Sequence, residues 1–441
     1  ISIMLLWLLL LQLLSPISSR PEAGSSDSAN LATTRLLDRS GVKRLPFRLQ
    51  PYDEGVYYTK LDERLRQALL NGRNYTQISV LSNIDALLAH NAKIGRLQLP
   101  VADRVSFPCD LSQGRSPEPP NDITHLRPGD IDIIAAFGDS TNAGTGILAL
   151  SWRDLMTEFR GFTYAGGGIE SWRTVLTLPN ILKLYNPNLY GYAVSHCLTV
   201  DPNSHFNVAE PMLLFLDFPF QAHVLIDRLR KDPKVDMAKH WKMLSIHVGP
   251  NDLCAELCHR DDLEAFLRTE QRLMYETFRL LRDNVPRLLI NFVIQPEIHD
   301  LLGLIRKMPN DCKGNALFFC HCHVKYNQAH FYSAAERFVN MQKEIAAMPE
   351  FQRDDFAIVN HGILRNISSL WSRNDVLDKS FMANDCIHFS QKGHAVLAKL
   401  LWNSLFAPTD FTFNEAWRSP FEHFLCPKAE SQFLRTKGDL Y

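Results

Sequence analysis

The sequence lacks an excess of charge of either sign. It contains 47 Lys and Arg residues and 48 Asp and Glu residues, which gives a formal net charge of −1. Proteins that bind nucleic acid usually carry a basic excess or a basic stripe, so we expect no nucleic-acid partner. The balance of charges neither favours nor excludes a lipid substrate.

Long hydrophobic runs are also missing. The apolar run from Met4 to Leu14 is shorter than the roughly 20 residues that a membrane-spanning helix needs, and no other stretch is long enough. With Ser15 to Ser19 behind it, the run is typical of a secretory signal peptide over residues 1–19. No initiator Met or basic start precedes it, so we expect the natural chain to begin earlier. The prediction is a secreted or extracellular protein; the alternative is an N-terminal membrane anchor.

Nine cysteines follow this segment, an odd number. They are Cys109, Cys197, Cys254, Cys258, Cys312, Cys320, Cys322, Cys386 and Cys426. In a secreted protein this count predicts disulfides, with at least one thiol left free or paired between chains. Two sequons, at Asn74 and Asn366, predict N-glycosylation.

The composition, 46% hydrophobic and 22% charged, is that of a globular protein with a sizeable core. No internal repeat is present. Residues 20–52 read as an aperiodic leader, and residues 53–122 as a helical arm that ends in a Pro-rich linker.

After residue 130, short apolar segments alternate with longer helical stretches. The expected strands cover residues 131–137, 190–194, 243–248, 288–294 and 356–359. The expected helices cover residues 147–159, 173–185, 211–230, 261–284, 327–347 and 391–406. Short apolar strands separated by helices favour a three-layer α/β sandwich with a mostly parallel five-stranded sheet.

A candidate nucleophile follows the first expected strand. In the segment 137–144, Gly138 permits a tight strand-to-helix turn that would hold Ser140 at the sheet edge, where active sites of open α/β sheets form. The N–H groups of the following helix would point toward this serine. The segment is not the lipase elbow G-x-S-x-G, because Asn142 stands in place of its second glycine. Taken alone, it is equally typical of an N-cap serine.

Two further blocks could donate hydrogen bonds to an oxyanion. Residues 164–170 contain the consecutive glycines Gly166, Gly167 and Gly168, whose amides no side chain shields. Residues 248–253 end another expected strand and contain Asn251, whose side-chain amide could donate from a rigid turn. Alone, these blocks are also typical of a flexible loop and an Asx turn.

A candidate base lies in the segment 384–390, just before an amphipathic stretch. Asp385 precedes His388 by three residues, so its carboxylate can turn back and accept the Nδ1–H of the imidazole. That contact would leave Nε2 free to take a proton from a serine. Alone, the pair is also typical of an Asp cap beside a surface histidine.

In their order, G-D-S, glycine block, G-x-N-D and D-x-x-H, the four blocks resemble the GDSL/SGNH hydrolase family over about residues 131–406, and within it the phospholipase B branch. The branch resemblance rests on residues 126–130, 177–182, 251–254, 385–390 and 426–427. It extends to about residue 436, so we expect an SGNH hydrolase domain with a flavodoxin-like fold over residues 123–436. Thr141 and Pro250 depart from the usual Leu and small residue, which could reshape substrate access.

The resemblance implies a serine esterase that needs neither a cofactor nor a metal. Ser140 would be the nucleophile and His388 the base. Asp385 would orient His388, with Asp252 as the alternative acid.

The same resemblance implies an oxyanion hole with three donors. They are the amide of Ser140, the amide of Gly167 with Gly166 as the alternative, and the side chain of Asn251. The expected substrates are fatty-acyl esters of phospholipids or lysophospholipids, met at a membrane or micelle surface. Two alternatives are an acetylesterase acting on carbohydrates or other small esters, and a catalytically silent binding protein on the same fold.

The family similarity keeps Cys386 beside His388, so a disulfide there would brace the D-x-x-H turn, and we predict Cys426 as its partner. The segment 320–323, Cys-His-Cys-His, could also suggest zinc. Structural zinc sites usually space their cysteines two to four residues apart, so we expect disulfides to Cys312 or to distant partners instead.

Overall fold

The computed structural model describes residues 60–260, 262–295, 298–325, 328–365, 371–407, 421–428 and 432–436. The expected signal peptide, the leader and the sequon at Asn366 lie outside these residues. The chain divides into two units, residues 1–71 and 72–441, with the boundary inside helix α3 (Lys60–Leu81).

The second unit is built on a five-stranded sheet in the order β1-β2-β3-β5-β4. Four strands run parallel: β1 (Ile131–Gly138), β2 (Trp241–His247), β3 (Leu288–Val293) and β5 (Phe356–His361). The short β4 (Gln352–Arg353) pairs antiparallel with β5. All residues of β2, β3 and β5 are buried, as expected for strands covered on both faces.

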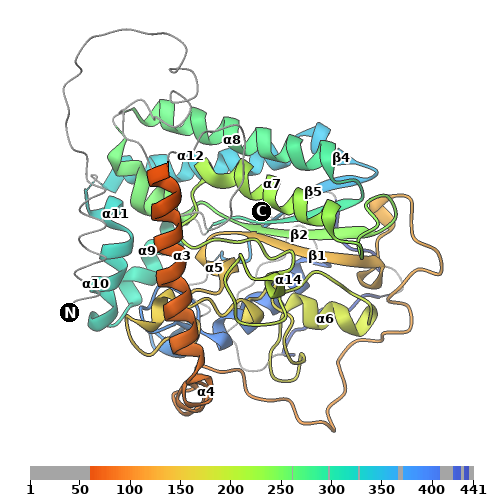
Figure 1. Ribbon diagram of the computed structural model, residues 1–441, viewed down its shortest axis with the longest axis horizontal. Helices are drawn as coiled ribbons and strands as arrows, with labels where there is room; N and C mark the ends of the chain where they lie inside the picture. The colour runs from red at the N-terminus through yellow and green to blue at the C-terminus, as the bar shows by residue number, and fades with distance from the viewer. Residues whose placement is uncertain are drawn as a thin grey trace. The chain divides into compact units, whose positions relative to one another are not determined.

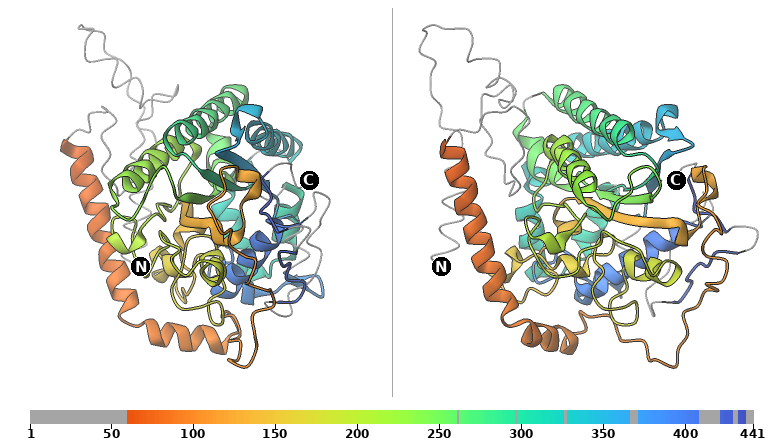
Figure 2. Two further views of the ribbon diagram at one scale, coloured as in Figure 1. Left: turned by 90° about the vertical axis from the view of Figure 1, so that its right-hand side faces the viewer. Right: turned by 45° about the vertical axis from the view of Figure 1, so that its right-hand side comes forward.

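Helices cover both faces of this sheet. On one face lie α7 (Phe218–Lys231), α8 (Leu263–Asn284) and α12 (Gln328–Ala346), and on the other α6 (Leu178–Tyr185) and α14 (Gln391–Ser404) (Figures 1 and 2). Shorter helices are α4 (Ile84–Lys93), α5 (Ser140–Ala143), α9 (Ile298–Lys307), α10 (Asn310–Phe319) and α11 (His321–Lys325). Strands β6 (Ser372–Arg373) and β7 (Val376–Leu377) form a separate pair. The three-layer α/β sandwich is therefore confirmed.

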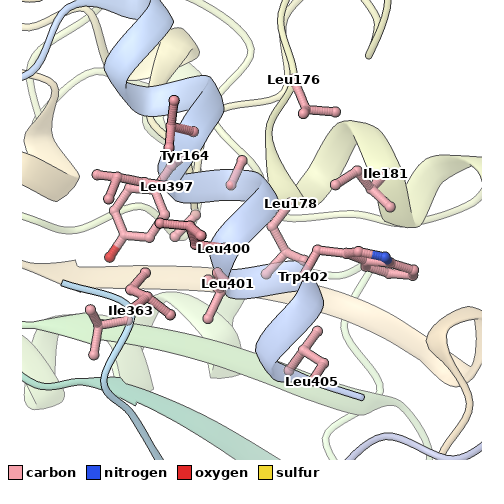
Figure 3. Packing of buried hydrophobic residues seen from close by; sticks show 14 of the residues in the cluster. Tyr164, Leu176, Leu178, Ile181, Ile363, Leu397, Leu400, Leu401, Trp402 and Leu405 are labelled. Atoms are coloured by element: carbon pink, nitrogen blue, oxygen red, sulfur yellow. The ribbon is translucent and has the colours of Figure 1, made fainter. Parts of the chain in front are cut away.

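Helix α14 anchors the end of the domain. Leu401 and Trp402 belong to a buried cluster with Leu178 and Ile181 of α6 (Figure 3). The Trp402 ring stacks on Tyr185 at 5.6 Å between centroids. Because α14 begins three residues after His388, this packing also fixes the position of the segment that carries the candidate base.

The expected strand at residues 190–194 was wrong. Tyr190 and Ala193 form one parallel bridge each, with Ile133 and Gly167. Gly191 lies between them at φ +107°, which turns the backbone out of the extended path and prevents a continuous ladder. The fifth strand of the sheet is β4 instead.

The expected helix at residues 147–159 was also wrong. Its helical content is one 3-10 turn at Asp154–Met156, and Glu158 pairs back across an antiparallel bridge with Thr145. Ile147 and Leu148 are buried in a second hydrophobic cluster, so their apolar spacing reflects burial in an irregular segment. The other five expected helices are present, some with shorter bounds. No helix among the described residues is both long and apolar enough to cross a bilayer.

Candidate active site

The candidate nucleophile stands on a turn that only glycine can make. Gly138 has φ +132°, and a Cβ there would lie 1.9 Å from the carbonyl oxygen of His247. Asp139 then caps α5: its side chain accepts from the amide of Thr141 at 2.9 Å. Ser140 is therefore the first residue of α5. Neither its hydroxyl nor its amide has a hydrogen-bond partner among the described residues, so both are available to a ligand.

The candidate base is held by a local turn. Asp385 is buried, and its Oδ2 lies 2.5 Å from Nδ1 of His388. Its Oδ1 accepts from the amides of Ile387 and His388, each at 3.0 Å. The side chain of His388 stays partly exposed, at 14%. This geometry leaves Nε2 for a proton transfer.

Electrostatics favour an ion pair within this turn. Burial lowers the pKa of His388, but the charge and hydrogen bond of Asp385, with a contribution from Asp139, outweigh burial and raise it above 6.5. Burial likewise raises the pKa of Asp385, but the charge of His388 and the three hydrogen bonds outweigh burial and lower it.

The nucleophile turn, the glycine block and the D-x-x-H turn meet at one place. Asp139, next to Ser140, is close enough to His388 to contribute to its raised pKa. His394, in turn, has its pKa lowered to about 3, chiefly by burial and also by His388, and its Nδ1 accepts from the amide of Tyr164 at 3.2 Å. The structure thus brings three of the four sequence blocks together.

The fourth block follows β2 and holds a neighbouring loop. The side chain of Asn251 donates to the carbonyl of Leu213 at 3.0 Å, which leaves its second amide hydrogen for another acceptor. Asp252 is buried, and its Oδ1 accepts from the amide of Phe215 at 3.1 Å. Nδ1 of His388 is paired with Asp385, so the geometry favours Asp385 over Asp252 as the residue that orients the imidazole.

The three glycines of the glycine block differ in whether their backbone amides already donate a hydrogen bond. The amide of Gly167 donates to Thr163 and that of Gly168 to Ala193, both at 3.0 Å. The amide of Gly166 has no partner within the described part of the chain. Of the two glycines that the sequence leaves open, Gly166 is therefore better placed to donate to an oxyanion.

Four disulfides form, and one cysteine, the buried Cys197, is free. The pairs are Cys109–Cys426, Cys254–Cys320, Cys258–Cys322 and Cys312–Cys386. The predicted bond between Cys386 and Cys426 was wrong, because spacing in the chain does not encode which distant cysteines the fold brings together. Cys386 is nevertheless oxidised, and its bond to Cys312 ties the D-x-x-H turn to α10.

One group of residues has ligand atoms close enough together to bind a metal ion. Ligand atoms of Cys258, His321 and Cys322 lie within 4.8 Å of one another. The two cysteines are bonded to each other, however, so they offer no thiolate in this state.

Apolar side chains, some of them exposed, lie near the candidate base. The Phe319 ring lies 6.1 Å from the His388 ring and stacks on Trp152 at 6.5 Å. Trp152 and Phe318, beside Phe319, are about half exposed, at 49% and 56%. Exposed apolar surface next to a reactive group suits an apolar substrate.

A group that sequence reasoning missed lies beside the glycine block. Arg73, Glu158, Arg160 and Glu210 are all buried and paired with one another. The only signal in the sequence is the presence of charged residues within segments that otherwise read as core.

Comparison with known proteins points to the same family as the four sequence blocks. Residues 134–401 match the family model of the GDSL-like lipases/acylhydrolases. The chain is 32% identical over 330 residues to the membrane-associated phospholipase B1 of Homo sapiens, a match that covers 72% of this chain and 22% of that protein. It is 32% identical over 331 residues to the Mus musculus protein of that name, with the same coverage. The Rattus norvegicus protein is 29% identical over 339 residues, 74% of this chain and 22% of its own length.

Proposed function

Because the chain belongs to the GDSL-like lipase/acylhydrolase family, as its motifs predict, we propose that it is a secreted serine hydrolase of fatty-acyl esters in phospholipids or lysophospholipids. The main support for the proposal is the arrangement around Ser140 and His388. Ser140, whose hydroxyl and amide have no partner among the described residues, directly follows Asp139, and the charge of Asp139 acts on the imidazole of His388, whose Nδ1 is held by the buried carboxylate of Asp385. An imidazole held in this way can accept the hydroxyl proton of a serine and so activate it for attack on an ester.

In the proposed reaction, Oγ of Ser140 attacks the ester carbonyl carbon and its proton passes to Nε2 of His388. Asp385 stabilises the imidazolium that forms. The oxyanion accepts hydrogen bonds from the amides of Ser140 and Gly166 and from the side chain of Asn251.

The tetrahedral intermediate then collapses. The alcohol leaves with the proton that His388 holds, and Ser140 keeps the acyl group as an ester. A water molecule attacks this acyl-enzyme, again giving a proton to His388. The second tetrahedral intermediate then collapses: the bond between the acyl carbon and Oγ breaks, His388 returns its proton to Oγ of Ser140, and the fatty acid leaves.

The apolar surface near His388 favours a lipid over the alternative small or carbohydrate ester. Trp152 and Phe318 could contact an acyl chain or a lipid surface, whereas an acetylated sugar would gain little from them. The relatives named phospholipase B1 point the same way, although the match spans only 22% of their length. The alternative of a silent binding protein is disfavoured by the unengaged hydroxyl of Ser140 beside an ordered Asp–His pair.

The proposal of an extracellular location rests on the cysteines. Disulfides persist in oxidising compartments and are rare in the cytosol, and this chain forms four. Asn74 is exposed on α3, so its sequon is accessible to glycosylation, which we propose for it. We further propose that the protein meets its lipid substrates at a membrane or micelle surface.

A labelling experiment tests the chemistry and the substrate class separately. A fluorophosphonate probe should modify Ser140, as shown by peptide mapping. The protein should release fatty acid from phosphatidylcholine or lysophosphatidylcholine and leave acetylated xylan unchanged. Labelling at another residue would refute the assigned nucleophile. Deacetylation of xylan without lipid hydrolysis would instead favour the alternative substrate.

A further inference from the structure

Four charged side chains form a buried cluster that the reaction above does not use. Glu158 and Arg160 are fully buried, and Arg73 and Glu210 are 6% and 4% exposed. Arg73 pairs with Glu158 and, at 3.2 Å, with Glu210, while the second oxygen of Glu158 pairs with Arg160. Removing a charge from water has a large desolvation cost, which pairing offsets only in part. Such a cluster is therefore a poor way to gain stability alone, and its contacts indicate another role.

One side of the cluster leads to the candidate catalytic groups. Arg160 donates to Oδ1 of Asn207 at 2.9 Å, which fixes the orientation of that amide. Nδ2 of Asn207 then donates to the carbonyl of Asn142, at 2.9 Å, in the helix that Ser140 begins. Gly166 packs against the same amide: a Cβ on Gly166 would lie 2.7 Å from Nδ2 of Asn207. A single side chain thus touches both the nucleophile helix and the glycine proposed to bind the oxyanion.

The other side of the cluster leads to α3. Arg73 and Gln77 are four residues apart and so share one face of this helix. Gln77 holds the backbone of Glu158 at both ends: its Nε2 donates to the carbonyl at 2.8 Å, and its Oε1 accepts from the amide at 2.9 Å. Phe159, next in the chain, donates its amide to the carbonyl of Gly144 at 2.8 Å, directly after α5.

We propose that Arg73 is a positioning residue for ester hydrolysis. Through Glu158, Arg160 and Asn207 it holds the Ser140 helix and Gly166 at the separation that one oxyanion requires. The inference rests on the proposed function, because it assigns Ser140 and Gly166 to the same reaction. It makes residues 72–81 of α3 part of the catalytic apparatus.

Loss of Arg73 would remove two of the three ion pairs of the cluster and leave the pair between Glu158 and Arg160. Burial raises the pKa of Glu210, and the charge of Arg73 opposes that rise, so loss of Arg73 would raise this pKa further. Glu158 would keep Arg160 but would no longer be held between two guanidinium groups. A shift of about 1 Å at a reacting group can reduce a rate by about 100-fold, so a small rotation of Asn207 suffices to lower the rate.

The test compares Arg73→Met and Arg73→Lys with the control Arg153→Met. Arg153 also contacts α3, through Ser79, but it is exposed and lies outside the cluster. We expect Arg73→Met to lower kcat by roughly 10- to 100-fold with KM nearly unchanged. Arg73→Lys should recover much of the loss, and Arg153→Met should have no effect. All rates are referred to the folded fraction measured by thermal unfolding.

Asn207→Ala keeps all three ion pairs and tests the connection if Arg73→Met does not fold. It should lower kcat about as much as Arg73→Met, and the double variant should lose little more than either single one. Additive losses, an unchanged kcat in Asn207→Ala, or a loss in Arg73→Met that follows only the folded fraction would each refute the positioning role.

The rate at which the fluorophosphonate modifies Ser140 gives a readout that no lipid substrate enters. It should fall in Arg73→Met and Asn207→Ala in parallel with kcat. If the wild-type protein is labelled at Ser140 but hydrolyses no lipid, the proposed substrate fails while the positioning role is still measured by labelling. If Ser140 is not labelled in the wild-type protein, both proposals fail.

Discussion

The two halves of the candidate site are held in different ways. The half that carries His388 is fixed by a carboxylate three residues away and by the disulfide Cys312–Cys386. The half that carries Ser140 and the glycine block, residues 137–170, contains no cysteine, and its support comes from buried polar contacts between distant segments. Arg73 and Glu158, for example, are 85 residues apart.

The two halves are held differently because the base and the oxyanion donors have different structural requirements. The base must hold one tautomer while its charge changes, and a carboxylate with a fixed position serves that purpose. The nucleophile half must place several donors around one oxygen atom, and donors from different loops can be aligned only by contacts that cross the fold. Local bonding suits the first task and a long-range network suits the second.

Removal of the nucleophile should give the largest effect. Ser140→Ala should reduce kcat by roughly 10⁶-fold, as loss of the serine does in a comparable triad. The fold should remain intact, because the hydroxyl has no partner within the described residues. Hydrolysis of a lysophospholipid and thermal unfolding measure the two outcomes, with Ser151→Ala, at an exposed serine, as the control. Turnover near that of the wild type would require another nucleophile.

Asp385→Asn should give the next largest loss, about 10⁴-fold in kcat, because the amide no longer holds the required tautomer of His388. Asp252→Asn is the matched comparison. Its carboxylate accepts from the amide of Phe215, so the change should cost less than Asp385→Asn. Steady-state rates of both variants decide between the two acids. If Asp252→Asn were the more damaging change, Asp252 would be the residue that orients the base.

The sequence predicts the locally determined features of the site better than those that depend on distant contacts. The contact of Asp385 with His388 is available to sequence reasoning because three residues of backbone determine it. The turn at Gly138 is available because its positive φ requires glycine. The alternation of apolar strands and helices was sufficient to predict the layers of the sandwich, since burial on both faces of a parallel sheet leaves continuous apolar runs.

Features that depend on distant contacts were not predictable. The choice between Gly166 and Gly167 depends on which amide Thr163 accepts from, which is a property of the folded loop. The partner of Cys386 depends on where α10 lies. The cluster around Glu158 requires α3, whose helical pattern in the sequence gives no indication of what its polar face contacts.

Removal of disulfides should distinguish bracing of the site from general stabilisation. The double variant Cys312→Ser/Cys386→Ser should lower the free energy of unfolding by roughly 2–4 kcal/mol. It should also lower the kcat of the folded protein by about 10-fold, because Cys386, at φ +62°, lies between Asp385 and His388 in the turn that the bond holds.

The matched control is Cys109→Ser/Cys426→Ser, which removes a bond away from the four sequence blocks. It should lose a comparable amount of stability and keep the kcat of the folded protein. Denaturant unfolding and rates referred to the folded fraction measure both quantities. Equal losses of kcat in the two variants would contradict a specific role for the bond to Cys386.

The smallest predicted effect tests whether the two halves interact electrostatically. His388 accepts a proton only when it is neutral, so kcat/KM should fall as the pH drops through a midpoint above 6.5, the direction in which Asp385 and Asp139 shift the pKa of His388. Asp139→Asn keeps a good helix cap but removes one negative charge, so it should lower this midpoint by less than about one pH unit. Because the pKa of His388 is raised on folding, its protonation stabilises the fold below its unfolded pKa, and this contribution is lost as the pH rises through the folded pKa. Activity should therefore rise over the pH range in which this part of the stability declines. An unchanged or higher midpoint in Asp139→Asn, from pH–rate profiles, would mean that the nucleophile half does not influence the base.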